Sequence, residues 1–298
     1  MFEKHHEPLA YDAPERGRIA LLPWDIETFG FGVADYEIDR SERDRLESSS
    51  IQASLEAWAR AHDVELVGTQ VPASDIAGVH FFGRIGFRTI ETTLVVRFDN
   101  IQKARRDAPR EVVLAPAGEQ DLEAILRMAG GTFQQGRYHA DVRVPRNLAD
   151  RRYQDWVRRT GLARNPQILL AARTDAEVCG FSIVEIDGRQ GYLHLYAVDP
   201  SRKGAGIGLS MIVELLRYFH ERGAGTVRSK ISAANVASMN TLAFLGGRFL
   251  DPRVMMHWHA PGPAWPPRWN VRHVRSQDKV GGIPPPVPTI LPRAKSSE

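Results

Sequence analysis

The stretch Tyr192–Gly223, YLHLYAVDPSRKGAGIGLSMIVELLRYFHERG, predicts a strand, a glycine-rich turn and a helix in direct succession. The apolar run Tyr192–Val198 ends before Pro200, which cannot donate a hydrogen bond to a sheet ladder. Glycines follow at positions 204, 206 and 208, and apolar residues then recur at helical spacing until Gly223 stops the helix. Glycines let backbone N–H groups approach an anion, and a helix N-terminus favours negative charge. The stretch therefore predicts a phosphate-binding turn.

The spacing of the glycines separates this turn from two other phosphate-binding motifs. A dinucleotide fingerprint needs G-x-G-x-x-G after the first strand of a doubly wound unit, whereas this turn is G-x-G-x-G and lies late in the chain. The Gly-Lys-Ser/Thr that closes a Walker loop does not follow it. Both of these nucleotide-binding motifs are therefore disfavoured.

A second motif begins at Asn235, where Asn-Val-Ala-Ser-Met-Asn-Thr-Leu is followed by Gly246. Together the two motifs resemble the acetyl-CoA-binding signature of the GNAT acyltransferase superfamily, with lysine where arginine or glutamine is usual. Lysine still meets a phosphate as a point charge, and Asn235 also fits an ordinary helix N-cap. The resemblance implies acetyl-CoA, or another acyl-CoA, as co-substrate. The residues expected to bind it are Ala197, Val198, Lys203, Gly204, Ala205, Gly206, Ile207, Gly208 and Asn235.

The resemblance departs from the family pattern at Leu242, where many GNAT enzymes carry a tyrosine that protonates the leaving CoA thiolate. Leucine cannot act as a general acid. The chain is therefore expected to use another proton donor, to release the thiolate unaided, or to carry out different chemistry.

A narrower resemblance covers residues 18–260. The segments Leu22–Gly32, Gly136–His139 and Asp150–Val157 are similar to the tandem-GNAT family of dTDP-fucosamine acetyltransferases. This implies an α/β (α+β) fold with a mixed central sheet flanked by helices, in two GNAT units of which the first is degenerate. The expected domains are 1–108 (degenerate unit), 109–260 (acyl-CoA-binding unit) and 261–298 (proline-rich basic tail).

The two halves of the chain end alike, with Phe82–Phe87 and Phe244–Phe249 each placing a glycine helix stop before a strand. An internal duplication and a chance similarity both explain this. The pattern along the chain predicts strands at 18–22, 33–38, 64–68, 87–98, 111–114, 167–173, 178–186, 191–198, 225–231 and 248–259. It predicts helices at 41–61, 73–84, 120–128, 148–160, 205–222 and 235–245, with a long polar loop at 131–146.

Catalytic candidates lie on the strand before the glycine turn. A backbone N–H around Tyr196–Val198 is expected to polarise the thioester carbonyl. With a side-chain period of two, Tyr192, His194 and Tyr196 would share one face. If that face lines the acceptor site, His194 is the natural proton acceptor; the alternative is that these are ordinary sheet residues. Tyr138, Tyr196 and Ser238 are candidate replacements for the missing acid.

The loop 131–146 carries the candidate substrate-binding residues Arg137, Tyr138 and His139, to which Tyr192 is added from the strand. Arginines there would suit a nucleotide-sugar pyrophosphate, and Tyr138 could stack on a base or sugar. A solvated basic loop is an equally good interpretation. No metal site is expected, because His257 and His259 alternate on one strand with no carboxylate near them in the sequence.

Composition limits the partners. The chain has 298 residues, 43% of them hydrophobic and 25% charged, which is ordinary for a globular protein. The last 38 residues hold six basic and two acidic residues and nine of the nineteen prolines, so residues 1–260 are nearly neutral despite the net charge of +3. No nucleic-acid or membrane partner is expected, a homodimer is possible, and the single Cys179 fits a cytoplasmic location. Within the tail, residues 264–274, with Trp265 and Trp269, are expected to pack on the body.

These observations lead to one main hypothesis and two alternatives. The main hypothesis is an N-acetyltransferase in which the amino group of a small molecule, best a nucleotide-linked amino sugar, attacks the thioester directly. The first alternative is a CoA-binding protein with altered chemistry, such as another acyl group, hydrolysis or decarboxylation. The second is a non-enzymatic interaction module.

Overall fold

The structure, a computed structural model, describes residues 10–12, 17–45, 47–103, 108–162, 166–202 and 204–261. The chain divides into two compact units, Met1–Gly262 and Pro263–Glu298. The second unit lies outside the described residues, as does the predicted packing of residues 264–274. Among the described helices, none is long and apolar enough to cross a membrane.

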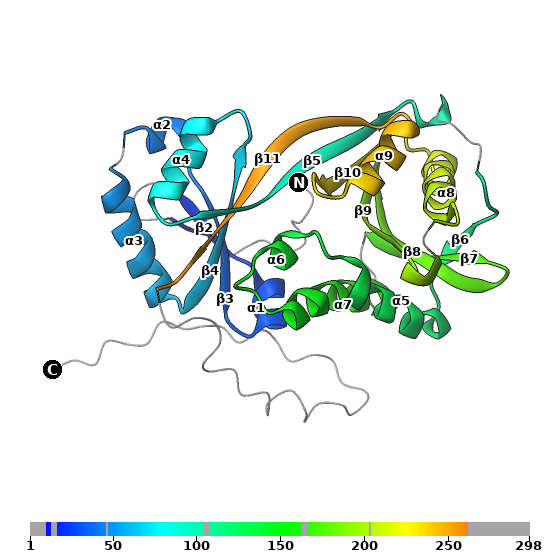
Figure 1. The fold of residues 1–298 in the computed structure, drawn as a ribbon, viewed down its shortest axis with the longest axis horizontal. Coiled ribbons are helices and arrows are strands. Elements are labelled where there is room, and N and C mark those ends of the chain that lie inside the picture. Colours follow the sequence, from blue (N-terminus) through cyan, green and yellow to red (C-terminus); the bar gives the residue numbers. More distant parts are fainter. Residues whose placement is uncertain are drawn as a thin grey trace, which may run out of the picture. The chain divides into compact units, whose positions relative to one another are not determined.

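One mixed sheet of eleven strands runs through the first unit, in the order β1-β2-β3-β4-β11-β5-β10-β9-β8-β7-β6 (Figure 1). The strands are β1 (Ala10–Asp12), β2 (Arg18–Leu21), β3 (Gly32–Glu37), β4 (Val64–Pro72), β5 (Arg88–Asp99), β6 (Val113–Pro116), β7 (Gln167–Thr174), β8 (Glu177–Asp187), β9 (Gln190–Val198), β10 (Thr226–Ser232) and β11 (Arg248–His259). The helices are α1 (Pro23–Phe29), α2 (Arg40–Arg43), α3 (Ser48–Ala61), α4 (Ile76–Arg84), α5 (Glu119–Thr132), α6 (Arg137–Ala140), α7 (Arg146–Leu162), α8 (Ile207–Glu221) and α9 (Val236–Phe244).

The predicted mixed sheet flanked by helices is confirmed, and most predicted elements are found within a few residues of their expected bounds. Two local predictions were wrong, and one helix was not predicted. The helix expected at 41–61 is broken into α2 and α3, and the loop expected at 131–146 contains α6. Helix α1 was missed, although Pro23 at its first turn and Gly30 at its end, with φ +79°, are the ordinary start and stop signals of a short helix.

The two halves repeat the same elements at a constant spacing. Helices α4 and α9 begin 160 positions apart, at Ile76 and Val236, and β5 and β11 follow at the same spacing. Asp75 caps α4 and Asn235 caps α9, each through a side-chain oxygen that accepts from the backbone N–H three residues later. The structure therefore favours a duplication over a chance similarity.

The last strand of each half pairs with the other half. Strand β11 runs antiparallel to β4, which belongs to the first half, whereas β5 runs antiparallel to β10, which belongs to the second. The two exchanged strands lie side by side in the middle of the sheet (Figure 1). The predicted division at residue 108 stays a prediction, and the sheet continues across it.

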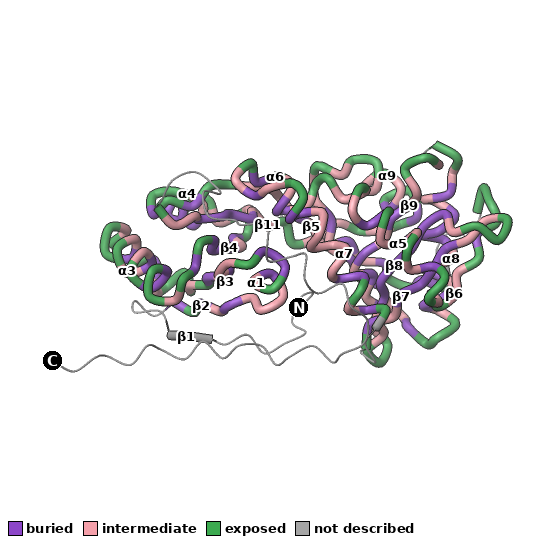
Figure 2. The backbone as a smooth tube through the Cα atoms, turned by 90° about the horizontal axis from the view of Figure 1, so that it is seen from below, coloured by how far each residue is buried: buried purple, intermediate pink, exposed green. Residues whose placement is uncertain are grey.

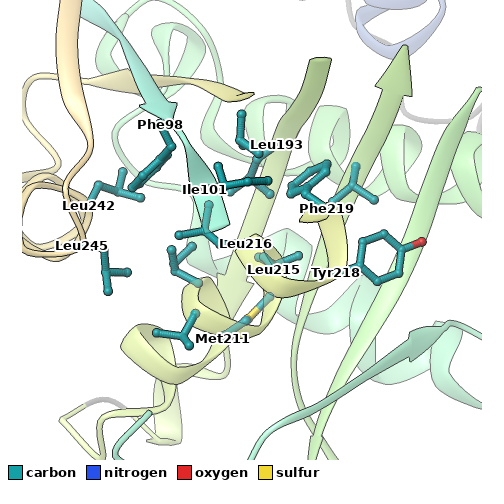
Figure 3. Close-up of a cluster of buried hydrophobic side chains, with 14 of the residues drawn as sticks. Phe98, Ile101, Leu193, Met211, Leu215, Leu216, Tyr218, Phe219, Leu242 and Leu245 are labelled. Carbon is teal, nitrogen blue, oxygen red and sulfur yellow. The ribbon is translucent and has the colours of Figure 1, made fainter. Parts of the chain in front are cut away.

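Buried residues follow the strands, and the outer turns of the helices are exposed (Figure 2). Helices α3 and α4 cover one cluster on β2, β3, β4 and β11, which includes Tyr36 and Trp58. Helix α8 covers a second, to which it contributes Met211 and Phe219 and to which β9 contributes Leu193 (Figure 3). Helices α5 and α7 cover a third on β7, β8 and β9. At about 25 cal/mol per Å² of apolar area removed from water, such clusters supply the main stabilisation of the sheet.

Candidate functional site

Strands β9 and β10 separate beside the predicted glycine turn. Their parallel pairing covers Gln190–Leu193 against Thr226–Ser229, and no later pair joins them among the described residues. Residues 194–198 of β9 therefore pair with β8 on one edge only. The backbone groups on the other edge are available to a ligand, as the predicted carbonyl-polarising N–H requires.

A β-bulge at His194 marks the point where the strands separate. Leu193 pairs with Val184 and Leu195 with Ile183, so His194 is the extra residue on β9. The bulge reverses the side-chain alternation: Leu193 packs under α8, whereas Leu195 packs under α5 and α7. The period-two prediction for this strand was therefore wrong beyond the bulge.

The three aromatic candidates on β9 consequently lie on two faces. Tyr192 and His194 stack with ring centroids 6.0 Å apart, and His194 lies 6.3 Å from the ring of Trp156 on α7. Tyr196 instead packs against the cluster under α8, with Ser238 of α9 as its polar neighbour. Tyr196 was predicted to share a face with His194; the bulge places it on the opposite face.

The glycine turn has the backbone that its sequence demands. Gly204 and Gly206 have φ of +84° and +79°, a region that favours glycine, and Gly206 is the N-cap of α8. A Cβ built on Gly206 would lie 3.0 Å from Cγ of Pro109. Ile207 and Gly208 then open α8, where the first backbone N–H groups have no partner within the helix. The turn fits a pyrophosphate; Lys203 lies outside the described residues.

The second motif lies across the gap between β9 and β10. The Asn235 side chain accepts from the Ser238 N–H at 3.2 Å, so the N-cap interpretation is confirmed. Leu242 is fully buried under α9 and brings no polar atom to the gap. The Tyr196 hydroxyl is buried without a hydrogen-bond partner of normal geometry among the described residues, and burial raises the pKa of Tyr196, opposed by Ser238. It is a neutral phenol beside the gap.

On the other face, His194 is held by a carboxylate that the sequence reasoning missed. Its Nε2 donates to Oε2 of Glu185 at 2.8 Å, and the His194 side chain is only 3% exposed. Glu185 lies opposite Tyr192 on the paired strand β8. A carboxylate that fixes one ring nitrogen orients the imidazole, which is the arrangement of a positioned proton acceptor.

The predicted substrate loop is anchored by Asp25 of α1, a second residue that the sequence reasoning missed. The Asp25 carboxylate accepts from the Tyr138 hydroxyl at 2.6 Å, from Arg137 at 3.2 Å and from Arg152 at 2.8 Å. Tyr138 is 3% exposed, and burial raises its pKa well above the usual range. Arg137 also lies 3.6 Å from Asp35. The charge of Arg137 is thus largely matched by protein carboxylates.

The histidines of β11 do have a carboxylate partner, contrary to prediction. Oδ2 of Asp141 accepts from Nδ1 of His257 and from Nε2 of His259, both at 2.7 Å. Burial opposes the ionised form of Asp141, but the two imidazole hydrogen bonds bring its pKa well below the usual range, whereas burial lowers the pKa of His257. The carboxylate oxygen of Asp141 and one ring nitrogen each of His257 and His259 lie within 4.8 Å of one another and form a group that could hold a metal ion.

His139, which was predicted to bind substrate, instead has its Nε2 atom 2.8 Å from Oδ1 of Asp150.

The first half has a different arrangement at the equivalent place. The segment 39–46, which lies 160 positions before the glycine turn, contains no glycine. Its Arg43 is buried and donates to Asp75 at 2.6 Å, and Asp75 occupies the position equivalent to Asn235. An ion pair therefore stands where the second half has the two motifs that resemble the CoA signature.

A cavity of about 930 Å³ remains beside this ion pair. Residues from both faces of β4 line this cavity. Thr69 and Val71 belong to the face that lies toward α4, and Gln70 belongs to the opposite face. The last pair between β3 and β4 is Asp35 with Gly68, and the residues that follow Gly68 on β4 line the cavity. Of the four predicted substrate-binding residues, Arg137 lines the cavity.

This geometry agrees with what the chain resembles. Residues 123–246 match the model of the acetyltransferase (GNAT) family. A tandem GNAT protein from the clavulanic acid biosynthesis pathway superposes with a TM-score of 0.53 and 17% identity, over 83% of this chain and 79% of that one. The fold is the GNAT fold in tandem, and the family model and the structural likeness together support the GNAT acetyltransferase superfamily.

Two curated relatives add detail. The mycothiol acetyltransferase of Kytococcus sedentarius is 31% identical over 132 residues, which are 43% of this chain and 42% of that protein. The spore coat polysaccharide biosynthesis protein SpsD of Bacillus subtilis is 23% identical over 184 residues, 62% of this chain and 63% of that protein. The matches thus span about half the length of these relatives.

Proposed function

We propose that this protein is an acetyl-CoA-dependent N-acetyltransferase that acts on the amino group of a small molecule. The observation that carries the proposal is the open edge of β9 beyond the His194 bulge, which lies next to the glycine turn and the N-terminus of α8. Backbone N–H groups of this edge would polarise the thioester carbonyl, and the turn would hold the pyrophosphate. Catalysis then rests mainly on positioning, because amine and thioester need no covalent enzyme intermediate.

The two faces of β9 suggest separate proton-transfer roles. His194, oriented by Glu185 on the α7 face, would accept the proton of the attacking amine. Tyr196, on the α9 face, would give its hydroxyl proton to the leaving thiolate in place of the tyrosine that Leu242 replaces. Its raised pKa keeps the phenol protonated until the sulfur leaves, as a general acid requires.

A nucleotide-linked amino sugar is the acceptor we propose. The resemblance of residues 18–260 to the fucosamine acetyltransferase family supports it, as does the match to a protein named for polysaccharide biosynthesis. The match to mycothiol acetyltransferases supports a small-molecule acceptor more generally. The buried Leu242 favours the alternative that the protein binds acyl-CoA but carries out other chemistry.

The test is CoA release from acetyl-CoA in the presence of a panel of amino sugars and their nucleotide derivatives. Tyr196→Phe is expected to lower kcat by roughly 100-fold or more, since positioned acids contribute about 10² to 10⁴. Tyr218→Phe, which removes another buried phenol from the same hydrophobic cluster, is the control and should leave kcat unchanged. Failure to bind acetyl-CoA would overturn the proposal, and CoA release without an acetylated product would favour the alternative.

A further inference from the structure

The cavity of the first half ends beside the proposed acceptor face. Trp156 lines the cavity and lies 6.3 Å from the ring of His194. Arg228, which also lines it, pairs in register with Tyr192 on the neighbouring strand β9. Val227 and Ile231 of β10 pack in the cluster under α8. Because side chains alternate along a strand, Arg228 and Lys230 lie on the opposite face, which is the face of Tyr192 and His194. The cavity and the acceptor side of the candidate site are therefore contiguous.

The cavity lining has a surplus of positive charge, with nine basic and six acidic side chains. Four of the six acids pair with lining arginines: Asp75 with Arg43, Asp25 with Arg137 and Arg152, Asp35 with Arg137, and Asp251 with Arg253. Among the described residues, neither Arg228 nor Lys230 forms an ion pair, and the Lys230 ammonium donates to the neutral side chain of Gln70 at 3.2 Å. Two adjacent cations without a carboxylate partner in a cavity favour an anionic ligand.

We infer that Arg228 and Lys230 bind a negatively charged group of the acceptor, a phosphate or a carboxylate, while the acceptor's amine lies against His194. This inference rests on the proposed function. Arg228 pairs in register with Tyr192, and Tyr192 lies two residues before His194 on β9. Because each residue advances a strand by about 3.3 Å, the anion bound by Arg228 and the amine beside His194 would lie roughly 7–10 Å apart. A single sugar ring spans that distance. The first half of the molecule thus contributes the cavity, and β10 contributes the cations within it.

The strand exchange explains how the first half reaches this position. Strand β10 is flanked by β5, and Thr93 and Val95 of β5 line the cavity beside Lys230. Lys230 in turn contacts Gln70 of β4. The anion site is therefore composed of residues from both halves.

The experiment compares three acceptors that share one ring and one amine: glucosamine, 2-amino-2-deoxyglucuronic acid and glucosamine 6-phosphate. Wild-type kcat/KM should rise at least tenfold from the neutral to a charged acceptor, and the preferred acid distinguishes carboxylate from phosphate. Arg228→Gln and Lys230→Gln should each remove most of that preference by raising KM, with glucosamine unaffected. Arg253→Gln is the matched control, because Asp251 already neutralises this cavity arginine.

Binding gives a readout that does not depend on turnover. Titration of CoA-saturated protein with each of the three compounds should show tighter binding of a charged one, lost in Arg228→Gln, with circular dichroism confirming that the variant is folded. Equal binding of all three compounds, or an unchanged preference in both variants, would overturn the anion site. If CoA does not bind and no amine is acetylated, the proposed function fails; if glucosamine is acetylated as well as the charged compounds, only the anion site fails.

Discussion

Replacing Asp75 by asparagine tests the ion pair between Arg43 and Asp75 in the first half. Arg43, whose side chain is 4% exposed, donates to both carboxylate oxygens of Asp75, at 2.6 and 3.3 Å. Breaking a buried pair by removing one charge costs about 3–5 kcal/mol. Two features reduce this cost: Arg43 keeps its hydrogen bonds to the half-exposed Asp44, and asparagine still caps α4 as well as aspartate does. We therefore expect a loss of about 2–3 kcal/mol in the free energy of unfolding.

The loss should depend on pH with a defined sign. The hydrogen bond from Arg43 lowers the pKa of Asp75 below its ordinary value of 3.8, against the opposing effect of burial. A group whose pKa is lower in the folded protein stabilises it above the unfolded value and loses that contribution as the pH falls through the folded value. The difference between wild type and Asp75→Asn should thus be full at pH 7 and pH 5 and shrink below about pH 3.8.

Urea unfolding at pH 7, 5 and 3, followed by circular dichroism, measures both effects. Asp251→Asn makes the same chemical change in a pair where the aspartate side chain is 51% exposed, and it should cost no more than about 1 kcal/mol at any pH. A loss below about 1 kcal/mol for Asp75→Asn at pH 7 would show that the buried pair contributes no more than a surface pair. A difference that grows toward acid pH would refute the assigned sign.

Two further predictions concern the glycine turn and the strand exchange. Gly206→Ala should weaken CoA binding at least tenfold, as measured by calorimetry, because the new Cβ lies 3.0 Å from Cγ of Pro109 and the backbone φ is +79°. Gly188→Ala is the control, because it imposes similar backbone strain (φ +54°) away from the turn with no atom near its Cβ. The Gly188→Ala variant should bind CoA normally. A fragment of residues 109–261 lacks β4 and β5, which are the partners of β11, so it should not fold as a monomer. Its NMR spectrum should therefore show no chemical-shift dispersion. A folded fragment that binds CoA would contradict this prediction.

Local pattern was enough to predict the elements that carry the candidate CoA site. The unit from β9 through α8 and the N-cap at Asn235 were predictable because glycines, helix caps and apolar spacing act within a few residues. The bulge at His194 was not, because an extra residue in one strand shows only against its partner, and it moved Tyr196 to the other face. Likewise, Asp141 lies 116 residues before His257, and no local signal joins them.

The first half lacks the two motifs of the second half but is joined to it through the exchanged strands β5 and β11. Arg43 and Asp75 stand 160 positions before Lys203 and Asn235, so two positions of the CoA motifs in one half are an internal ion pair in the other. That pair occupies the place of the glycine turn and of the second motif, and the cavity lies beside it. Because β11 completes the sheet of the first half and β5 borders β10, the first half cannot be removed without exposing the strand that carries Arg228 and Lys230. Under the proposed function, the first half contributes the wall of the acceptor cavity and the strand that borders β10, whether or not it binds a cofactor of its own.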